Sequence, residues 1–500
     1  MDEKLHFVLL PFMAQGHTIP MVDIAKVLAQ RSGITVTLLL TPSNHARVKP
    51  IIDRSSQLGM DILVQELIFS AEEAGLPAGC ENLDALPSTS LMGNFFTAVY
   101  SLRPQIETLL RKMHPKPCCL VADMCFTFMA EVSQELGIPR IYFHGMSCFT
   151  FLCAHQILTS KILDTVSDEF EYFDVPGMPH KVSFTESQVK GMAAPKNKGW
   201  MEFNDKLIVN EDAAYGVIFN TFEDLEHIYI REYEKVRHKR IWSLGPVSMF
   251  NREPADKVIR GKTSSVDVDQ CLKWLDSWEP NTVVYACLGT ISNLTAGQML
   301  ELGLGLEASG RPFIWSIGSS GDGHNESKEL LQKLMVQDGF EERVGTAGRR
   351  GLMIWGWAPQ VLILSHRAVG GFLTHCGWNS SMEGISAGLP MVTWPLIADQ
   401  FYNEKLVVDV WKIGVRVGAK RTMEFGKEEE IGVQVRKDEV RRAVEKLMDG
   451  GDEEGEARRK RAKELANKAK EAVEGGGSSY VNIGKFIEDI RNLATMKNQL

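Results

Sequence analysis

The chain has 500 residues, of which 44% are hydrophobic and 24% are charged. This length exceeds a single domain of ~100–200 residues, so at least two domains are expected, and the composition excludes wholesale disorder and a fibrous repeat. The net charge of -9 gives no general attraction to nucleic acid or to anionic lipid, and neither is predicted as a main partner.

The first half of the sequence alternates short apolar runs with helix-like stretches. A buried strand is predicted at residues 6–10, a loop at 13–18, and a helix with Pro20 in its first turn that ends near Arg31. A later helix ends near Gly137. Further strands are predicted at residues 34–40, 118–122, 138–143 and 216–220. Strands separated by helices predict parallel pairing with right-handed crossovers.

The second half repeats this pattern. Polar residues 245–269 predict an interdomain linker, residues 318–329 a mobile loop, and residues 437–474 a charged, solvated helical face. The helix of this half is predicted at residues 295–309, and its strands at 282–288, 312–317, 351–355, 369–373 and 391–394.

Two α/β halves of this kind predict a ligand cleft between them. Ligands bind beyond the carboxyl ends of parallel strands, where loops lead into helices. The loops concerned are residues 13–18, 123–126, 289–292, 356–360, 374–381 and 396–400.

Cysteine usage and the N-terminus indicate the compartment. The nine cysteines are dispersed, odd in number and without a CxxC pair, which argues against a disulfide framework or a structural zinc site and favours a reducing compartment. The N-terminus begins acidic and its apolar run stops at Pro11, a poor signal peptide. No apolar run reaches the ~18–20 residues that span a membrane. A cytoplasmic location without membrane insertion is expected.

Residues 357–400 form the most informative segment. Within it a predicted strand ends, and Gly377 permits a tight turn into a helix that Asn379 or Ser380 would cap. Free N–H groups at the start of this helix, together with His375, form an anion site that would fit a diphosphate.

Other residues of the segment suit the rest of a nucleotide sugar. Trp357 follows a strand and could present a flat face to a base. Glu383 lies one turn into the helix and could accept hydrogen bonds from ribose hydroxyls. Asp399 can accept from two adjacent sugar hydroxyls, whereas Gln400 can both donate and accept.

This segment resembles the plant secondary-product glycosyltransferase signature of the UDP-dependent glycosyltransferases, over all 44 positions. Within that family the chain is similar to the subgroup that glycosylates triterpenoids, steroids and flavonoids. The resemblance extends to PFMAQGHTIP, GLPAGCENLD, ELGIPRIYFHG, GVIFNTFEDLE, WSLGPV, WLDSWEPNTVVYACLGT and GGSSY.

The resemblance implies an α/β protein of the GT-B fold, in which two Rossmann-like domains with parallel sheets face each other across a cleft. It implies an acceptor-binding domain at residues 1–245, a linker at 246–269 and a UDP-sugar-binding domain at 270–480. A C-terminal helix at residues 481–500 would return to the first domain.

The resemblance also implies an inverting, metal-independent reaction. His17 would deprotonate the acceptor hydroxyl, and Asp123 would orient and charge that histidine. These residue types suit the chemistry, because an alcohol needs a base to attack C1 of the sugar and a buried carboxylate stabilises the imidazolium that forms. Attack opposite the leaving UDP would give a β-O-glycoside.

The donor contacts carried over from the family divide into two sets. Gln at position 400 and Trp at position 378 accompany use of glucose in the family, so UDP-glucose is the expected donor. The UDP contacts would be Trp357, Ala358, Gln360, His375, Asn379, Ser380, Glu383, Gly289 and Thr290, and the sugar contacts Trp378, Asp399 and Gln400.

Two other motifs are interpreted as structural. The DxD at residues 267–269 lies in a charged linker before a helix, where metal–diphosphate binding is not expected. Gly303 and Gly305 match a relaxed dinucleotide fingerprint but lie inside a helical stretch, and close helix packing is the expected role.

The expected function is transfer of glucose from UDP-glucose to a hydroxyl of a hydrophobic small molecule by a monomer without a metal or other cofactor. Alternatives within the fold are another UDP-sugar or an acceptor that already carries a sugar. A dehydrogenase needs more glycines than the single one in PFMAQGH. A non-catalytic nucleotide-sugar-binding protein is disfavoured because both His17 and Asp123 are present.

Overall fold

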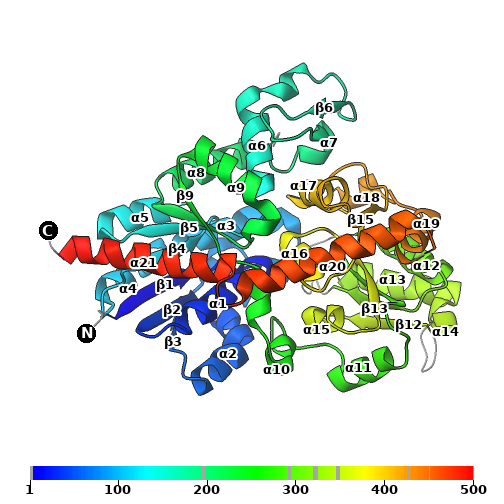
Figure 1. The fold of residues 1–500 in the computed structure, drawn as a ribbon, viewed down its shortest axis with the longest axis horizontal. Coiled ribbons are helices and arrows are strands. Elements are labelled where there is room, and N and C mark those ends of the chain that lie inside the picture. Colours follow the sequence, from blue (N-terminus) through cyan, green and yellow to red (C-terminus); the bar gives the residue numbers. More distant parts are fainter. Residues whose placement is uncertain are drawn as a thin grey trace.

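The computed structural model describes residues 4–193, 198–290, 294–318, 325–344, 350–424, 427–449 and 451–498. It contains two parallel sheets, each covered by helices, which gives the predicted α/β architecture (Figure 1). Part of the loop predicted at residues 318–329 lies outside the described residues.

The first sheet has seven parallel strands in the order β3-β2-β1-β4-β5-β8-β9. The sequence analysis missed β3 and β9, because these strands lie at the two edges of the sheet and lack a continuous apolar run. The strands are β1 Leu5–Leu10, β2 Ile34–Leu40, β3 Ile62–Glu66, β4 Cys119–Asp123, β5 Arg140–His144, β8 Gly216–Phe219 and β9 Arg240–Ser243.

Helices cover both faces of this sheet, and a small antiparallel hairpin projects from it at the top of Figure 1. The hairpin strands are β6 Tyr172–Asp174 and β7 Ser183–Thr185, followed by α7 Glu186–Val189. The other helices are α1 Gln15–Ala29, α2 Pro42–Gln57, α3 Met92–Ser101, α4 Arg103–Lys112, α5 Met129–Leu136, α6 Cys148–Ser160, α8 Lys198–Asp212 and α9 Glu223–Arg237.

The start of α1 corrects the sequence analysis. The helix begins at Gln15 rather than near Pro20, so His17 lies in the first helical turn and not in a loop. Pro20 is tolerated inside the helix because the carbonyl oxygen of Gly16, which would otherwise pair with the missing N–H, accepts a hydrogen bond from Asn379.

The second sheet has six parallel strands in the order β12-β11-β10-β13-β14-β15. The three-residue edge strand β15 was not predicted. The strands are β10 Val283–Cys287, β11 Phe313–Ile317, β12 Gly351–Trp355, β13 Val369–Thr374, β14 Met391–Thr393 and β15 Gly414–Arg416. The helices include α11 Val268–Asp276, α12 Ala296–Ala308, α13 Asn325–Asp338, α14 Phe340–Val344, α15 Gln360–Leu364, α16 Trp378–Ser386, α17 Gln400–Lys405 and α18 Glu428–Ile431.

The two motifs interpreted as structural have structural roles. Asp267 is the N-cap of α11, and its side chain accepts a hydrogen bond of 2.9 Å from the backbone N–H of Gln270. A Cβ added at Gly305 would lie 2.5 Å from Cβ of Val440, so close packing requires this glycine. The predicted linker contains a 3₁₀ turn at Val247–Phe250 and α10, Pro254–Val258.

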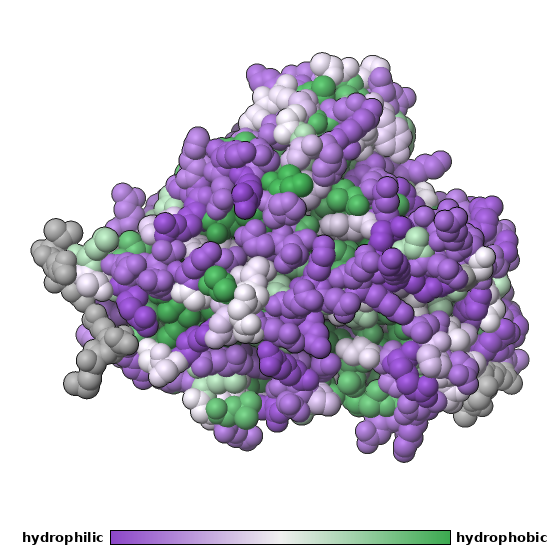
Figure 2. Space-filling view, in the orientation of Figure 1, coloured by the Kyte–Doolittle hydropathy of each residue, from purple (hydrophilic) through white to green (hydrophobic). Residues whose placement is uncertain are grey.

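The C-terminal helices tie the two sheets together. The stretch predicted as a charged helical face forms α19, Lys437–Met448, and α20, Glu453–Val473, and the molecular face that α20 crosses is largely hydrophilic (Figure 2). Then α21, Ser478–Asn498, packs on the first sheet. No helix among the described residues is long and apolar enough to cross a membrane.

An aromatic side chain of α21 is buried against the first sheet. Phe486 is 0% exposed, and its ring centroid lies 5.7 Å from that of Phe7 and 5.1 Å from that of Trp242. Met496, on the same helix, is 63% exposed.

We expect Phe486→Ala to lower the free energy of unfolding by about 3–5 kcal/mol, because it removes a buried ring and leaves a cavity. Met496→Ala is the matched control and should change stability by less than about 0.5 kcal/mol. Urea denaturation monitored by tryptophan fluorescence measures both. Equal unfolding midpoints for the two variants would contradict the packing role of Phe486.

Candidate active site

A histidine–aspartate pair lies at the carboxyl edge of the first sheet. Because β1 and β4 are parallel neighbours, the helical turn after β1 and the last residue of β4 meet at this edge. His17 Nδ1 lies 2.8 Å from Asp123 Oδ2, and the other oxygen of Asp123 accepts a hydrogen bond of 3.0 Å from the N–H of Cys125. The Asp123 side chain is 0% exposed, whereas that of His17 is 20% exposed. His17 can therefore take a proton from a substrate through Nε2.

The environment of His17 raises its pKa above the ordinary value of 6.5. Burial alone lowers this pKa, but the charge and hydrogen bond of Asp123 and the charge of Asp399 outweigh the burial. We call each sheet with the helices that cover it a unit, and Asp399 belongs to the second unit. The predicted base of one unit and a predicted sugar-binding carboxylate of the other unit are therefore electrostatic neighbours.

The backbone beside His17 contacts the second unit directly. Pro20 lacks the N–H that would bond to the carbonyl oxygen of Gly16 within α1. That oxygen instead accepts a hydrogen bond of 2.5 Å from Asn379 Nδ2. The sequence analysis predicted Asn379 as a phosphate contact and did not foresee that its side chain bridges the two units.

Asn220 completes this bridge and was also missed. Its Nδ2 donates to Asn379 Oδ1 over 3.1 Å, and its carbonyl oxygen accepts from Trp378 Nε1 over 2.8 Å. The available signal was an asparagine at the end of a predicted strand. Trp378 is only 2% exposed. Its indole N–H already has a partner, so a contact of Trp378 with the sugar would have to come from its backbone.

The predicted diphosphate residues come together at the N-terminus of α16. His375 precedes this helix, and burial lowers its pKa to about 4, opposed by a smaller effect of a hydrogen bond that the ring donates to the backbone of Cys287. His375 is therefore neutral near pH 7. Gly289 has φ of +83°, and a Cβ added there would lie 2.7 Å from His375 Nε2. A Cβ added at Gly377 would lie 2.4 Å from the same nitrogen. Both glycines are needed for the ring to occupy this place.

The start of α16 supplies the rest of this anion site. The first N–H groups of a helix have no partner within it and favour negative charge. Asn379 and Ser380 lie in that first turn and are half-buried, as is Thr290 after β10.

The predicted ribose residues form one hydrogen-bonded group. Gln360 Nε2 donates to Glu383 Oε2 over 2.8 Å and to Ser380 Oγ over 3.1 Å. The guanidinium of Arg260, a linker residue that the sequence analysis missed, donates to Glu383 Oε1.

The predicted base-stacking residue is held by the linker. The N–H of Trp357 donates to Ser265 Oγ over 2.9 Å, and the N–H of Ser265 donates to the carbonyl oxygen of Trp357 over 2.8 Å. Ala358, the next residue, is buried. Ser265 carried no recognisable signal in the sequence.

The predicted sugar contacts Asp399 and Gln400 lie at the start of α17. Burial raises the pKa of Asp399 to about 6, while a hydrogen bond from Asn403 and the charge of His17 oppose the rise. Asn403 Nδ2 lies 2.6 Å from Asp399 Oδ2, and Asn403 Oδ1 accepts a 3.0 Å hydrogen bond from Ser147 Oγ of the first unit. Asn403 was not predicted, although it positions this carboxylate.

Gln400 corrects a detail of the sequence analysis. Its Oε1 accepts hydrogen bonds from the N–H groups of Leu396, over 2.8 Å, and Ile397, over 3.0 Å. The side chain therefore cannot both donate and accept toward a sugar, and only its Nε2 is available as a donor.

Among the described residues, one group of three potential metal ligands lies within 4.8 Å, namely His17, Asp123 and Cys125. Burial and the neighbouring charge of Asp123 raise the pKa of the Cys125 thiol well above its ordinary value. Because both oxygens of Asp123 already accept hydrogen bonds, this set fits a proton-transfer pair better than a metal centre.

We expect the pKa of His17, measured by NMR titration of its ring protons, to lie above 6.5. The substitution Asp123→Asn removes the negative charge of Asp123 and its charged hydrogen bond, which are the two largest effects that raise the pKa of His17. Burial remains, so the pKa of His17 should fall below the wild-type value. By linkage, protonated His17 stabilises the fold below pH 6.5, and this stabilisation is lost as the pH rises through the folded pKa. An identical titration in the variant would contradict this electrostatic coupling.

The chain was compared with known proteins. Residues 266–426 match the family described as UDP-glucoronosyl and UDP-glucosyl transferase. The chain is 48% identical over 430 residues to UDP-glycosyltransferase 73C1 of Arabidopsis thaliana, covering 86% of this chain and 85% of that relative. It shows the same identity over 430 residues to UDP-glycosyltransferase 73C12 of Barbarea vulgaris, with the same coverage.

Solved structures agree over nearly the whole chain. Glycyrrhiza uralensis UGT73P12, complexed with glycyrrhetinic acid 3-O-monoglucuronide, is 35% identical with a TM-score of 0.87, covering 99% of this chain and 97% of its own. Phytolacca americana UGT2, complexed with UDP-2fluoro-glucose and pterostilbene, is 26% identical with a TM-score of 0.72, covering 97% of this chain and 99% of its own. The fold is therefore GT-B, and the chain belongs to the plant UDP-dependent glycosyltransferases.

Proposed function

We propose that this glycosyltransferase moves glucose from UDP-glucose to a hydroxyl group of a hydrophobic small molecule and inverts C1 to form a β-O-glucoside. The observation that carries this proposal is the position of His17. It is hydrogen-bonded to buried Asp123 over 2.8 Å and lies within electrostatic reach of Asp399 from the other unit. An acceptor base and a sugar-binding carboxylate thus adjoin where the two units meet.

The reaction follows from this placement. His17 Nε2 takes the proton of the acceptor hydroxyl as the oxygen bonds to C1, and Asp123 stabilises the imidazolium. The bond from C1 to the diphosphate oxygen breaks, and UDP leaves with the electron pair. The first turn of α16 and neutral His375 stabilise that leaving charge without a metal or other cofactor.

An aromatic row supports a hydrophobic acceptor. Phe12 lies edge-on to His17 with ring centroids 5.5 Å apart, and it stacks on Phe96 at 5.7 Å. Phe96 in turn contacts Phe203 at 4.9 Å and Trp200 at 6.3 Å. These rings extend from the half-buried His17 to an exposed tryptophan and suit a flat apolar molecule.

The ligands named for the solved relatives point the same way. UGT73P12 holds a glucuronide, a molecule that already carries a sugar, and Phytolacca americana UGT2 holds pterostilbene beside a fluorinated UDP-glucose. The first of these favours a second candidate, in which the acceptor is an existing glycoside.

The proposed enzyme acts as a monomer in the cytoplasm.

We expect His17→Ala to lower the rate of UDP release with UDP-glucose and a sterol or phenol acceptor by about 10²–10⁴-fold, because a general base is lost. UDP affinity should stay near the wild-type value. His227→Ala removes an exposed histidine on α9 and is the matched control. EDTA should leave the wild-type rate unchanged. Near-normal turnover of His17→Ala with an unactivated alcohol would remove His17 from the mechanism, and loss of rate in EDTA with recovery in Mg²⁺ would overturn metal independence.

We expect kcat/KM for UDP-glucose to exceed that for UDP-galactose and UDP-glucuronic acid by at least about tenfold, or ~1.4 kcal/mol, with one common acceptor. A donor whose hydroxyl points elsewhere leaves buried Asp399 or the Nε2 of Gln400 unpaired. Gln400→Ala should lose most glucose transfer. Equal values for the three donors would contradict this assignment of specificity.

A further inference from the structure

Arg260 of the linker lies buried between two carboxylates from different units. Its side chain is only 7% exposed. Nε donates to Asp23 Oδ2 of α1 over 2.9 Å, and Nη1 donates to Glu383 Oε1 of α16. One planar guanidinium thus joins the helix that begins beside His17 to a carboxylate of the donor site.

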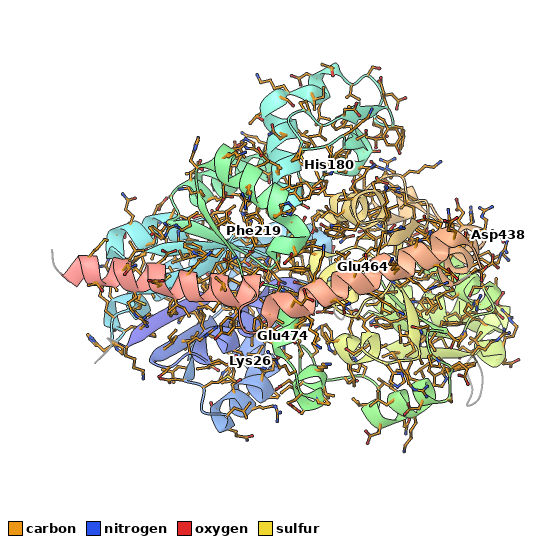
Figure 3. All side chains as sticks on the ribbon, in the orientation of Figure 1. Lys26, His180, Phe219, Asp438, Glu464 and Glu474 are labelled. Atoms are coloured by element: carbon orange, nitrogen blue, oxygen red, sulfur yellow. The ribbon has the colours of Figure 1, made fainter. Side chains whose placement is uncertain are left out.

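The contacts on the α1 side hold the arginine in place. The second oxygen of Asp23 accepts a 2.7 Å hydrogen bond from Asn251 Nδ2, and Lys26 Nζ donates to Asn251 Oδ1 over 2.6 Å. Figure 3 labels Lys26 on α1. Arg54 pairs with the linker residue Asp256 over 2.7 Å and contacts neither carboxylate bound by Arg260. The linker is therefore seated on the first unit by buried polar pairs.

On the donor side, the linker contacts two residues that are predicted to bind uridine. Glu383 Oε2 accepts from Gln360, which leaves Oε1 to Arg260. The next residue, Gly261, has φ of +96°, and a Cβ there would lie 2.2 Å from Cζ2 of Trp357. The linker thus contacts both the predicted base-stacking residue and the predicted ribose-binding residue.

A buried carboxylate that loses its cationic partner turns away or takes up a proton, and in either case it no longer accepts two hydroxyl protons in a fixed direction. Lysine cannot replace this arginine, because its single ammonium lacks the fork that reaches two carboxylates. We propose that Arg260 is a positioning residue that fixes Glu383 for the ribose hydroxyls of the donor. This inference rests on the ribose role of Glu383 in the proposed function.

The test compares binding of UDP and of 2′,3′-dideoxy-UDP, which lacks the ribose hydroxyls, by isothermal titration calorimetry. In Arg260→Gln and in Arg260→Lys, UDP affinity should fall by about tenfold or more, while dideoxy-UDP affinity changes by less than about threefold. Arg54→Gln, on the other side of the same linker network, should change neither. With UDP-glucose, the Arg260 variants should raise KM and leave kcat within about threefold.

Two results would overturn the inference. If the Arg260 variants lose UDP and dideoxy-UDP affinity equally, the arginine is merely structural. If wild-type protein binds the two nucleotides equally, Glu383 does not bind the ribose hydroxyls. Should Arg260→Gln fail to fold, Arg260→Lys and an Arg260 variant made in a Glu383→Gln background test the inference instead. In the Glu383→Gln background, removal of Arg260 should not reduce the preference for UDP over dideoxy-UDP any further. Ribose-dependent binding without glucose transfer would leave this inference standing and overturn only the proposed function.

Discussion

Asp123 has no exposure to solvent, and a carboxylate in that position must be hydrogen-bonded through both oxygens. One oxygen is held by the backbone after β4 and the other by His17, so the imidazole has a single orientation. The remaining site is arranged around this fixed ring. The aromatic row begins at Phe12 beside it, and Asp399 of the second unit influences its charge.

The two units meet through polar contacts at the site itself. Pro20 leaves the carbonyl oxygen of Gly16 without a helical partner, and Asn379 supplies the missing donor. Asn403 similarly joins Ser147 of the first unit to Asp399 of the second. Residues predicted or inferred to contact the donor therefore also hold the units in register. The predicted nucleotide contact Asn379 thus also connects the two units.

The linker adds a third connection and forms one wall of the predicted donor site. Ser265 pairs with the backbone of Trp357 in both directions, and Arg260 joins Asp23 to Glu383. Such buried charged groups are stable only when every partner is present. A segment that reads as a polar connection in the sequence is thus one of the more constrained parts of the molecule.

The sequence by itself determined the parallel α/β architecture, because buried strands in the interior of a parallel sheet consist of continuous apolar runs, as in β8 and β10. It did not reveal β3 and β15, whose edge positions require no such run. Residue types in the segment from Trp357 to Gln400 sufficed to nominate donor contacts, since their chemistry is legible in a local motif. Tertiary structure alone decided the roles of Asn220, Arg260 and Asn403, whose partners lie 158, 123 and 256 positions away in Trp378, Glu383 and Ser147. A hydrogen bond between distant segments leaves no periodicity or spacing in the chain, so only the fold can bring such partners together.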